Sequence, residues 1–175
     1  IAAGGIPIAF LTAVYGLEYL ARLRSGESIL VHSATGGVGT AALQVARRSD
    51  AQIFATAGTP EKRALLRAQG IRHVFDSRSL EFVKEIQAAT DGHGIDVVLN
   101  SLAGKALSGG VSLLAPGGRF LEIGKRDIYA DHSLSMLLLQ RNRSFLALDL
   151  EQVIEESPDL LAELFAQVAA GLESG

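Results

Sequence analysis

The sequence contains no cysteine and no tryptophan, and only one methionine and four prolines among 175 residues. Without cysteine the chain has no disulfide, no thiolate metal ligand and no cysteine nucleophile. A basic excess is also missing, because the formal net charge is -3. The broad positive field with which proteins bind nucleic acid or anionic membranes is therefore absent. We expect neither partner, no metal, and a cytoplasmic setting.

The apolar segment 1–20 does not have the pattern of a signal peptide or membrane span. No basic residue precedes it, two glycines and Pro7 interrupt it, and Glu18 falls within the spanning length. Helical spacing of apolar residues instead predicts a helix over 7–23, with Pro7 in its first turn. We interpret it as the entry helix of a domain cut from a longer chain.

Beyond residue 25 the sequence alternates between short apolar runs and amphipathic segments. The runs predict strands at 28–33, 52–57, 73–76, 96–100, 119–124 and 144–149. The segments predict helices at 38–48, 60–69, 80–89 and 105–114, a short helix at 134–139 and a closing helix at 158–172. Strands that are apolar on both faces and separated by helices form parallel sheets covered on both sides. The prediction is a single α/β domain with a doubly wound, six-stranded parallel sheet, the Rossmann fold.

The first predicted strand runs into a glycine-rich turn and then a helix of small residues. Its loop matches the dinucleotide fingerprint with Ala34 in the first glycine place and with Gly36 and Gly39 at the correct offsets. We expect the amides of Gly37 and Val38 to face a pyrophosphate, where the helix dipole favours negative charge. Gly39 would let the helix pack closely on the strand.

The end of the second predicted strand indicates which dinucleotide is bound. NAD-preferring domains place an acid there for the ribose hydroxyls, but this chain has none from Thr56 until Glu61. Lys62 and Arg78 lie where cations could bind a 2'-phosphate. The neighbouring Arg63 should face solvent, because adjacent helical positions diverge by about 100°. Thr56, Lys62 and Arg78 are therefore predicted to favour NADPH.

Residues that follow the fourth and fifth predicted strands are expected to approach the nicotinamide or its ribose. These folds bind ligands at the carboxyl ends of their strands. The predicted residues are Asn100, Ser101, Leu102, Ile123 and Gly124. His32, at the end of the first strand, is interpreted as a packed residue.

Four segments together, at 28–39, 76–78, 96–104 and 117–127, resemble the enoyl reductase domains of type I polyketide synthases and animal-type fatty acid synthases. These domains belong to the zinc-free part of the medium-chain dehydrogenase/reductase superfamily. The resemblance covers nearly the whole chain, and its Asn-Ser-Leu-Ala and Glu-Ile-Gly-Lys segments are more specific than the glycine loop. Family members also have a substrate subdomain, which these residues do not include.

The resemblance implies NADPH-dependent reduction of an α,β-unsaturated acyl thioester held on an acyl carrier protein, within a larger synthase. By their place in the family's motifs, Lys125 and Asp149 would line the nicotinamide side and assist protonation. A lysine suits this chemistry because its cation stabilises enolate charge and can deliver a proton. Two alternative functions remain open: a stand-alone NADPH:quinone oxidoreductase and a non-catalytic dinucleotide-sensing domain.

The last predicted strand should lie at one edge of the sheet. Phe145, Leu146 and Leu148 place apolar groups on both of its faces, and no proline or inward charge interrupts it before Asp149. Edge-to-edge pairing about a two-fold axis would join two copies into one continuous sheet. We therefore expect a homodimer.

Overall fold

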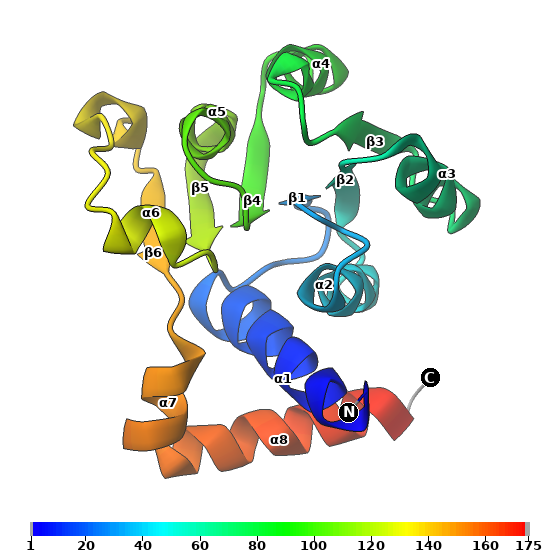
Figure 1. Ribbon diagram of the computed structural model, residues 1–175, viewed down its shortest axis with the longest axis vertical. Coiled ribbons are helices and arrows are strands. Elements are labelled where there is room, and N and C mark those ends of the chain that lie inside the picture. The colour runs from blue at the N-terminus through cyan, green and yellow to red at the C-terminus, as the bar shows by residue number, and fades with distance from the viewer. Residues whose placement is uncertain (1, 174–175) are drawn as a thin grey trace.

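The fold is a six-stranded parallel sheet with helices on both faces, seen in a computed structural model that describes residues 2–173 (Figure 1). The strand order is β3-β2-β1-β4-β5-β6, and every neighbouring pair is parallel. The strands are β1 (Ser28–Val31), β2 (Gln52–Ala57), β3 (His73–Asp76), β4 (Ile95–Asn100), β5 (Leu114–Glu122) and β6 (Ser144–Ala147). This is the doubly wound order, so the predicted fold class is confirmed.

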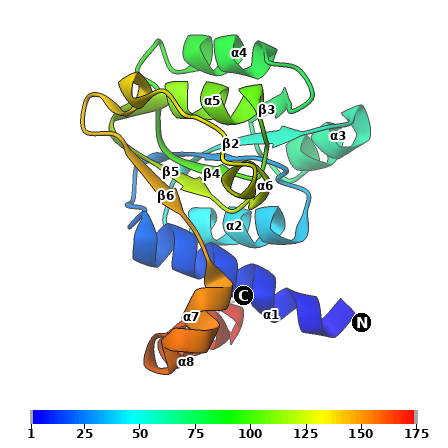
Figure 2. The ribbon, with the colours of Figure 1, turned by 60° about the vertical axis from the view of Figure 1, so that its left-hand side comes forward.

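Helices connect and flank the strands. They are α1 (Ala2–Val14), the π-helix η1 (Tyr15–Leu20), α2 (Gly37–Arg48), α3 (Pro60–Ala68), α4 (Glu81–Ala89), α5 (Lys105–Ser112), α6 (Arg126–Tyr129), the 3-10 helix η2 (Met136–Leu139), α7 (Leu150–Glu156) and α8 (Pro158–Glu173). Figure 2 shows α4 and α5 on one side of the sheet and α1 and α2 on the other. Within the described residues, no helix has the length and apolar character needed to cross a membrane.

The core consists of two apolar layers, one on each face of the sheet. In β1, Ile29 and Val31 belong to the layer under α1 and α2, whereas Leu30 belongs to the layer under α4 and α5. All four residues of β1 are buried. Because successive side chains of a strand point to opposite faces, a strand buried on both faces needs the continuous apolar run that the sequence shows.

Several predicted boundaries are wrong, three of them as follows. The first helix begins at Ala2 rather than at Pro7, so the proline lies inside the helix, where its φ fits but its missing N–H leaves one helical hydrogen bond unmade. The fifth strand begins at Leu114 and not at 119, and the fourth crossover helix ends at Ser112. A register shift lets β5 bend past β4 between the pairs Ile95–Leu114 and Val97–Arg119, so a turn-like sequence lies within a strand.

Two short helices, α6 and α7, were not predicted. They follow the ends of β5 and β6 directly, and β6 stops at Ala147 rather than continuing to Asp149. Asp149 instead caps α7, where its side chain accepts hydrogen bonds from the amides of Glu151 and Gln152. Helices of four and seven residues show too few turns for a periodic pattern to be recognised.

Candidate dinucleotide and active site

The loop between β1 and α2 has the geometry of a phosphate-binding turn. Gly36 is the N-cap of α2 in an extended conformation, with φ -78° and ψ 172°. A Cβ atom at Gly39 would lie 2.5 Å from the carbonyl oxygen of Ser33 and 2.7 Å from the Cα of Ala34. Both are backbone atoms, so only glycine fits at position 39, as predicted. Gly37 differs, because a Cβ there would meet only the Ala9 methyl at 3.8 Å.

The first turn of α2 offers backbone N–H groups without competition. No side chain caps the helix, and no acidic residue lies in its first turn. The amides of Gly37 and Val38 belong to this turn, where an α-helix makes no internal N–H bonds. Beside it, the hydroxyl of Ser101 donates to that of Ser33 at 3.0 Å, which brings the loops after β1 and β4 together. An anion is favoured at such a helix end.

Thr56 and His32 form a buried pair behind this loop. Thr56 is fully buried, and its Oγ1 lies 2.9 Å from His32 Nδ1. Burial lowers the pKa of His32 to about 3, so the imidazole is neutral and packed, as the sequence indicated. The prediction that Thr56 contacts a cofactor is wrong for its side chain, because that side chain points into the core.

Arg78 lies across the end of β2, as predicted. A Cβ atom at Gly58 would be 3.0 Å from Arg78 Nε, so the arginine side chain covers the glycine. Lys62 is exposed in the first turn of α3, and its amide donates to the N-cap hydroxyl of Thr59. Arg78 thus lies at the carboxyl end of β2, and Lys62 lies in the first turn of the helix that follows this strand.

Arg63 does not face solvent, and that expectation is corrected. Its Nη1 lies 3.0 Å from Asp76 Oδ2 and donates to the Ala57 carbonyl at 3.2 Å, with 18% of the side chain exposed. The reason is the Asp76 carboxylate at the end of β3, beside β2. The spacing of residues along α3 does not reveal this partner. The guanidinium links the ends of the two strands.

A cavity of about 340 Å³ lies beyond the glycine loop, at the carboxyl ends of β5 and β6. Its lining combines apolar side chains with one hydroxyl, one cation and one anion. The residues are Ile8, Thr12, Val38, Ile123, Lys125, Leu148, Leu150, Glu151 and Ile154. Val38 belongs to the first turn of α2, so the cavity adjoins the phosphate loop. Ile123, which the sequence predicted near the nicotinamide, lines this cavity.

Lys125, which lines this cavity, is in contact with Asp149 and Glu151. Lys125 Nζ lies 3.3 Å from Asp149 Oδ1 and 2.5 Å from Glu151 Oε2. The bond to Glu151, and then that to Asp149, raises the pKa of Lys125 above its ordinary value, so it is cationic at neutral pH. Partial burial opposes ionisation of Asp149, but bonds from the Gln152 amide and Lys125 lower its pKa overall. Glu151 was missed because α7, which positions it, was not predicted.

Asn100 is placed differently from the prediction. It is fully buried, and its Nδ2 donates to the carbonyl of Leu102 at 2.7 Å and to Glu122 Oε2 at 2.5 Å. Its amide therefore turns inward rather than toward a nicotinamide. Gly124 and Leu102 lie in the loops it stabilises, and the Gly124 amide donates to Glu122 Oε1 at 2.5 Å. Glu122 is the buried residue that sequence analysis missed.

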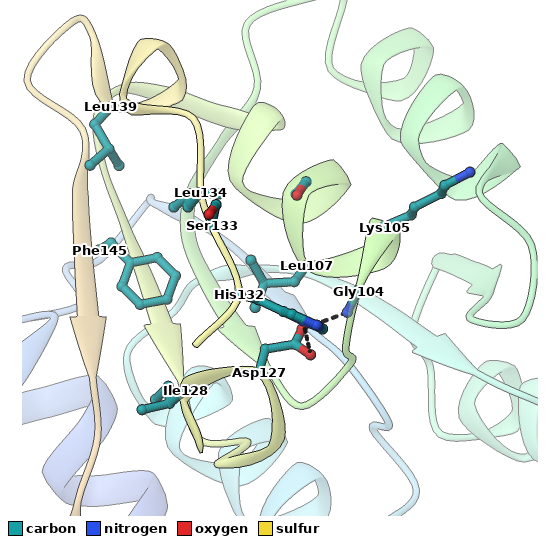
Figure 3. A pocket seen from close by; sticks show the side chains of 11 residues that line it. Gly104, Lys105, Leu107, Asp127, Ile128, His132, Ser133, Leu134, Leu139 and Phe145 are labelled. Atoms are coloured by element: carbon teal, nitrogen blue, oxygen red, sulfur yellow. Dashed lines mark hydrogen bonds and ion pairs between the residues drawn. The ribbon is translucent and has the colours of Figure 1, made fainter. Parts of the chain in front are cut away.

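A larger cavity, of about 610 Å³, lies on the α5 side of the sheet between α5, α6, η2 and β6. Figure 3 shows apolar side chains around it, among them Leu107, Leu134 and Phe145, with Asp127 hydrogen-bonded to His132 at one end. Neither Lys125 nor the glycine loop lines it. Within residues 2–173, no group of three His, Asp or Glu side chains is placed to hold a metal ion.

Comparison with known proteins identifies the family. The model of the family described as zinc-binding dehydrogenase matches residues 37–166. The solved nucleotide-binding subdomain of the enoyl reductase domain of PpsC from Mycobacterium tuberculosis is 46% identical, with a TM-score of 0.92 over 97% of this chain and 95% of that one. The chain therefore belongs to the zinc-binding dehydrogenase family and, within it, to the enoyl reductase domains of polyketide synthases. A second solved structure, a putative enoyl reductase domain of polyketide synthase, is 44% identical, with a TM-score of 0.91 over 97% of this chain and 94% of that one.

The enoyl reductase resemblance seen in the sequence is thus confirmed, and curated relatives extend it. The phthioceranic/hydroxyphthioceranic acid synthase of Mycobacterium tuberculosis is 53% identical over 97% of this chain. The chain spans only 8% of that protein's length. Together these similarities support a reductase module with a nicotinamide dinucleotide as cofactor.

The glycine loop provides a paired test. We expect Gly39→Ala to destabilise the fold by about 1–3 kcal/mol, because its methyl group would overlap backbone atoms of the preceding turn. Gly37→Ala should leave stability within about 0.5 kcal/mol, since its methyl group has room. Urea denaturation of both variants measures the difference. Equal stability of the two would contradict the close approach at Gly39.

Proposed function

We propose that this chain is the NADPH-binding half of an enoyl reductase that reduces the α,β double bond of an enoyl thioester carried on an acyl carrier protein. The observation that carries the proposal is that Lys125, paired with Asp149, lines a cavity adjoining the glycine loop. The polyketide synthase relatives favour this activity over quinone reduction. Partners would be the acyl carrier protein and the other domains of the parent synthase.

The residues present fit a bound dinucleotide. The α2 N-terminus offers free amides to a pyrophosphate, and the absence of a side chain at Gly39 lets that helix end lie close to β1. Arg78 and Lys62 would attract a 2'-phosphate at the edge of β2, where the ion pair with Arg63 offsets the charge of the neighbouring Asp76. The cavity beyond Val38 has apolar walls suited to a nicotinamide ring. A reduced nicotinamide bound there would supply hydride to the β-carbon of the enoyl group.

Lys125 would act at the other end of the reacting bond. As hydride arrives at the β-carbon, negative charge develops on the thioester oxygen, and a nearby ammonium stabilises it. The same group can deliver a proton to the α-carbon, which completes the reduction. Asp149 and Glu151 hold Lys125 protonated and restrict where its Nζ can lie.

Assembly of two copies through β6 is part of the proposal. The strand pairs only with β5 among the described strands, so its other edge is free for pairing. Leu146 is half-buried and packs against the layer under α1. An edge strand without proline or inward charge is a template for another strand. A two-fold axis there would produce one continuous sheet.

Cofactor preference is the first test. Arg78→Gln should weaken NADPH binding by about 1.5–3 kcal/mol, because a charge-assisted bond to the 2'-phosphate is lost. NADH binding should not change. Calorimetric titration with both nucleotides measures this. Arg72→Gln is the matched control, because Arg72 is exposed and precedes β3, whereas Arg78 follows it. Equal affinity of the unaltered chain for NADPH and NADH would refute the preference.

The role of Lys125 is tested in the complete enoyl reductase that carries this chain. Lys125→Ala should lower enoyl thioester reduction about 100-fold or more, the range expected for loss of a general acid. NADPH affinity should be nearly unchanged. Lys84→Ala, at an exposed lysine of α4, controls for loss of a positive charge. Unchanged turnover in Lys125→Ala would show that Lys125 is a loop residue without a role in the reaction.

Light scattering across a concentration series tests the dimer. The unaltered chain should dimerise, and Leu146→Lys should yield monomers, because a charge would be introduced at the paired edge. Leu65→Lys alters an exposed leucine of α3 and should leave the dimer intact. A monomer at all concentrations, or a dimer insensitive to Leu146→Lys, would exclude β6 as the interface.

A further inference from the structure

Two buried carboxylates connect the loops that follow β4 and β5. Glu122, the last residue of β5, is 1% exposed. Its Oε2 accepts from Asn100 Nδ2 and its Oε1 from the Gly124 amide, both at 2.5 Å. Asn100 is the last residue of β4 and the register partner of Glu122. One carboxylate therefore links the end of one strand to the turn after the next.

Asp127 makes the second link, from α6. It is 8% exposed, and its Oδ2 accepts from the amide of Gly104, the N-cap residue of α5, at 2.5 Å. Its Oδ1 lies 2.9 Å from His132 Nδ1, so three segments meet at this side chain (Figure 3). The connection after β4 and the connection after β5 are thus joined twice, each time through an acid from the β5 side.

Glu122 is unusual because its partners in the described part of the chain are neutral N–H groups and no cation pairs with it. A buried carboxylate without a counter-charge is costly, and an amide side chain could fill the same space. What the carboxylate provides is two acceptor oxygens, one for each of two donors that converge on it. A neutral glutamine would present its own N–H₂ to one of those donors.

The bond to Gly124 transmits this constraint to Lys125. A Cβ atom at Gly124 would lie 2.6 Å from Glu122 Oε1, so the turn closes tightly on the carboxylate. Lys125 is the next residue and the N-cap of α6, the helix that Asp127 links to α5. Lys125 is consequently held from both sides along the chain before its Nζ reaches Asp149 and Glu151.

We propose that Glu122 and Asp127 form a carboxylate brace that positions Lys125 at the nicotinamide-side cavity, a role that rests on the proposed reductase function. Glu122 is a positioning residue in this scheme, since it acts through the Gly124 amide. The brace fixes where the ammonium group lies relative to the reacting bond. Misplacement by about 1 Å can cost roughly 100-fold in rate.

The brace depends on the charge of Glu122. Burial, with the negative charge of Asp127, raises the pKa of Glu122 to about 7, although the bonds from Asn100 and Gly124 oppose this. Protonation would convert one acceptor oxygen into a hydroxyl group. Its hydrogen would face an N–H donor, and the hydrogen bond between that oxygen and the donor would be lost. The brace therefore tightens as the pH rises through about 7. The other charged or titratable groups around it are Asp127 and His132 on the α6 side and Lys125 in the turn itself.

Nuclear magnetic resonance of the chain tests the brace without any turnover. An amide that donates to a carboxylate resonates downfield, so the Gly124 amide should shift downfield as the pH rises, with a midpoint near 7. Glu122→Gln should abolish this titration. Asp96→Asn is the matched control, because Asp96 joins β4 to β1 by accepting from Ser28 at the opposite end of the sheet. It should leave the Gly124 titration unchanged. A Gly124 amide that does not titrate in the unaltered chain would overturn the proposal.

Turnover of the complete enoyl reductase then tests positioning. Glu122→Gln should lower kcat about 10- to 100-fold while the KM for NADPH stays within about 2-fold, because the misplaced group acts on the reacting bond. The rise of kcat through pH 7 should disappear, whereas His132→Asn should retain it. Asp127→Asn should lower kcat less and keep the rise. Unchanged kcat in Glu122→Gln, or a rise that is lost only in His132→Asn, would refute the positioning role.

The two proposals fail in different ways. If the unaltered enzyme reduces no enoyl thioester, the proposed function is wrong, and the Gly124 titration still reports whether the brace exists. If the enzyme is active but Gly124 does not titrate, the brace is wrong and the proposed function stands. The titration of the unaltered chain requires no variant, so a Glu122→Gln protein that failed to fold would not obscure this result.

Discussion

The close approach of α2 to the end of β1 is the constraint on which the rest of the structure depends. At Gly39 the helix lies so near the Ser33 carbonyl that no side chain fits between them. This contact places the free amides of α2 at the carboxyl edge of the sheet, between β2 on one side and β4 on the other. Since β1 is central and buried on both faces, the remaining strands and helices assemble around this one packed turn.

Function-bearing groups gather at the carboxyl edge because every strand of the sheet runs in the same direction. The loops after β1, β3 and β4 bring the free amides of α2, Arg78 and Ser101, and those after β5 and β6 bring Lys125 and Asp149. In the proposed function, parallel topology separates two tasks along one edge, with nucleotide recognition near β2 and reduction chemistry near β5. The opposite end of the sheet is held by structural contacts such as Asp96 with Ser28.

The sequence was sufficient for six strands, a doubly wound parallel sheet and the glycine loop, because apolar runs alternate with helical patterns and the loop is a short steric motif. The family resemblance named Lys125 and Asp149 together, and in the structure they are in contact at the ends of the neighbouring strands β5 and β6. Arg63 and Asn100 were misplaced for a common reason. Their orientations depend on Asp76 and Glu122, partners from other strands, and no pattern along one segment reports which carboxylate lies opposite. The short helices α6 and α7 were not predicted, because capping and tertiary contacts define them more than periodicity does.

Glu122 shows how stability and site geometry can oppose each other. Its pKa is raised from 4.5 to about 7, so between these values the folded chain binds more protons than the unfolded chain. Stability contributed at this position is therefore greatest below the unfolded pKa and decreases as the pH rises toward the folded pKa. Over the same interval the ionised carboxylate gains its second acceptor and holds the turn before Lys125 more firmly. A residue selected for stability alone would be neutral here, so the buried charge is better understood as the cost of fixing that turn.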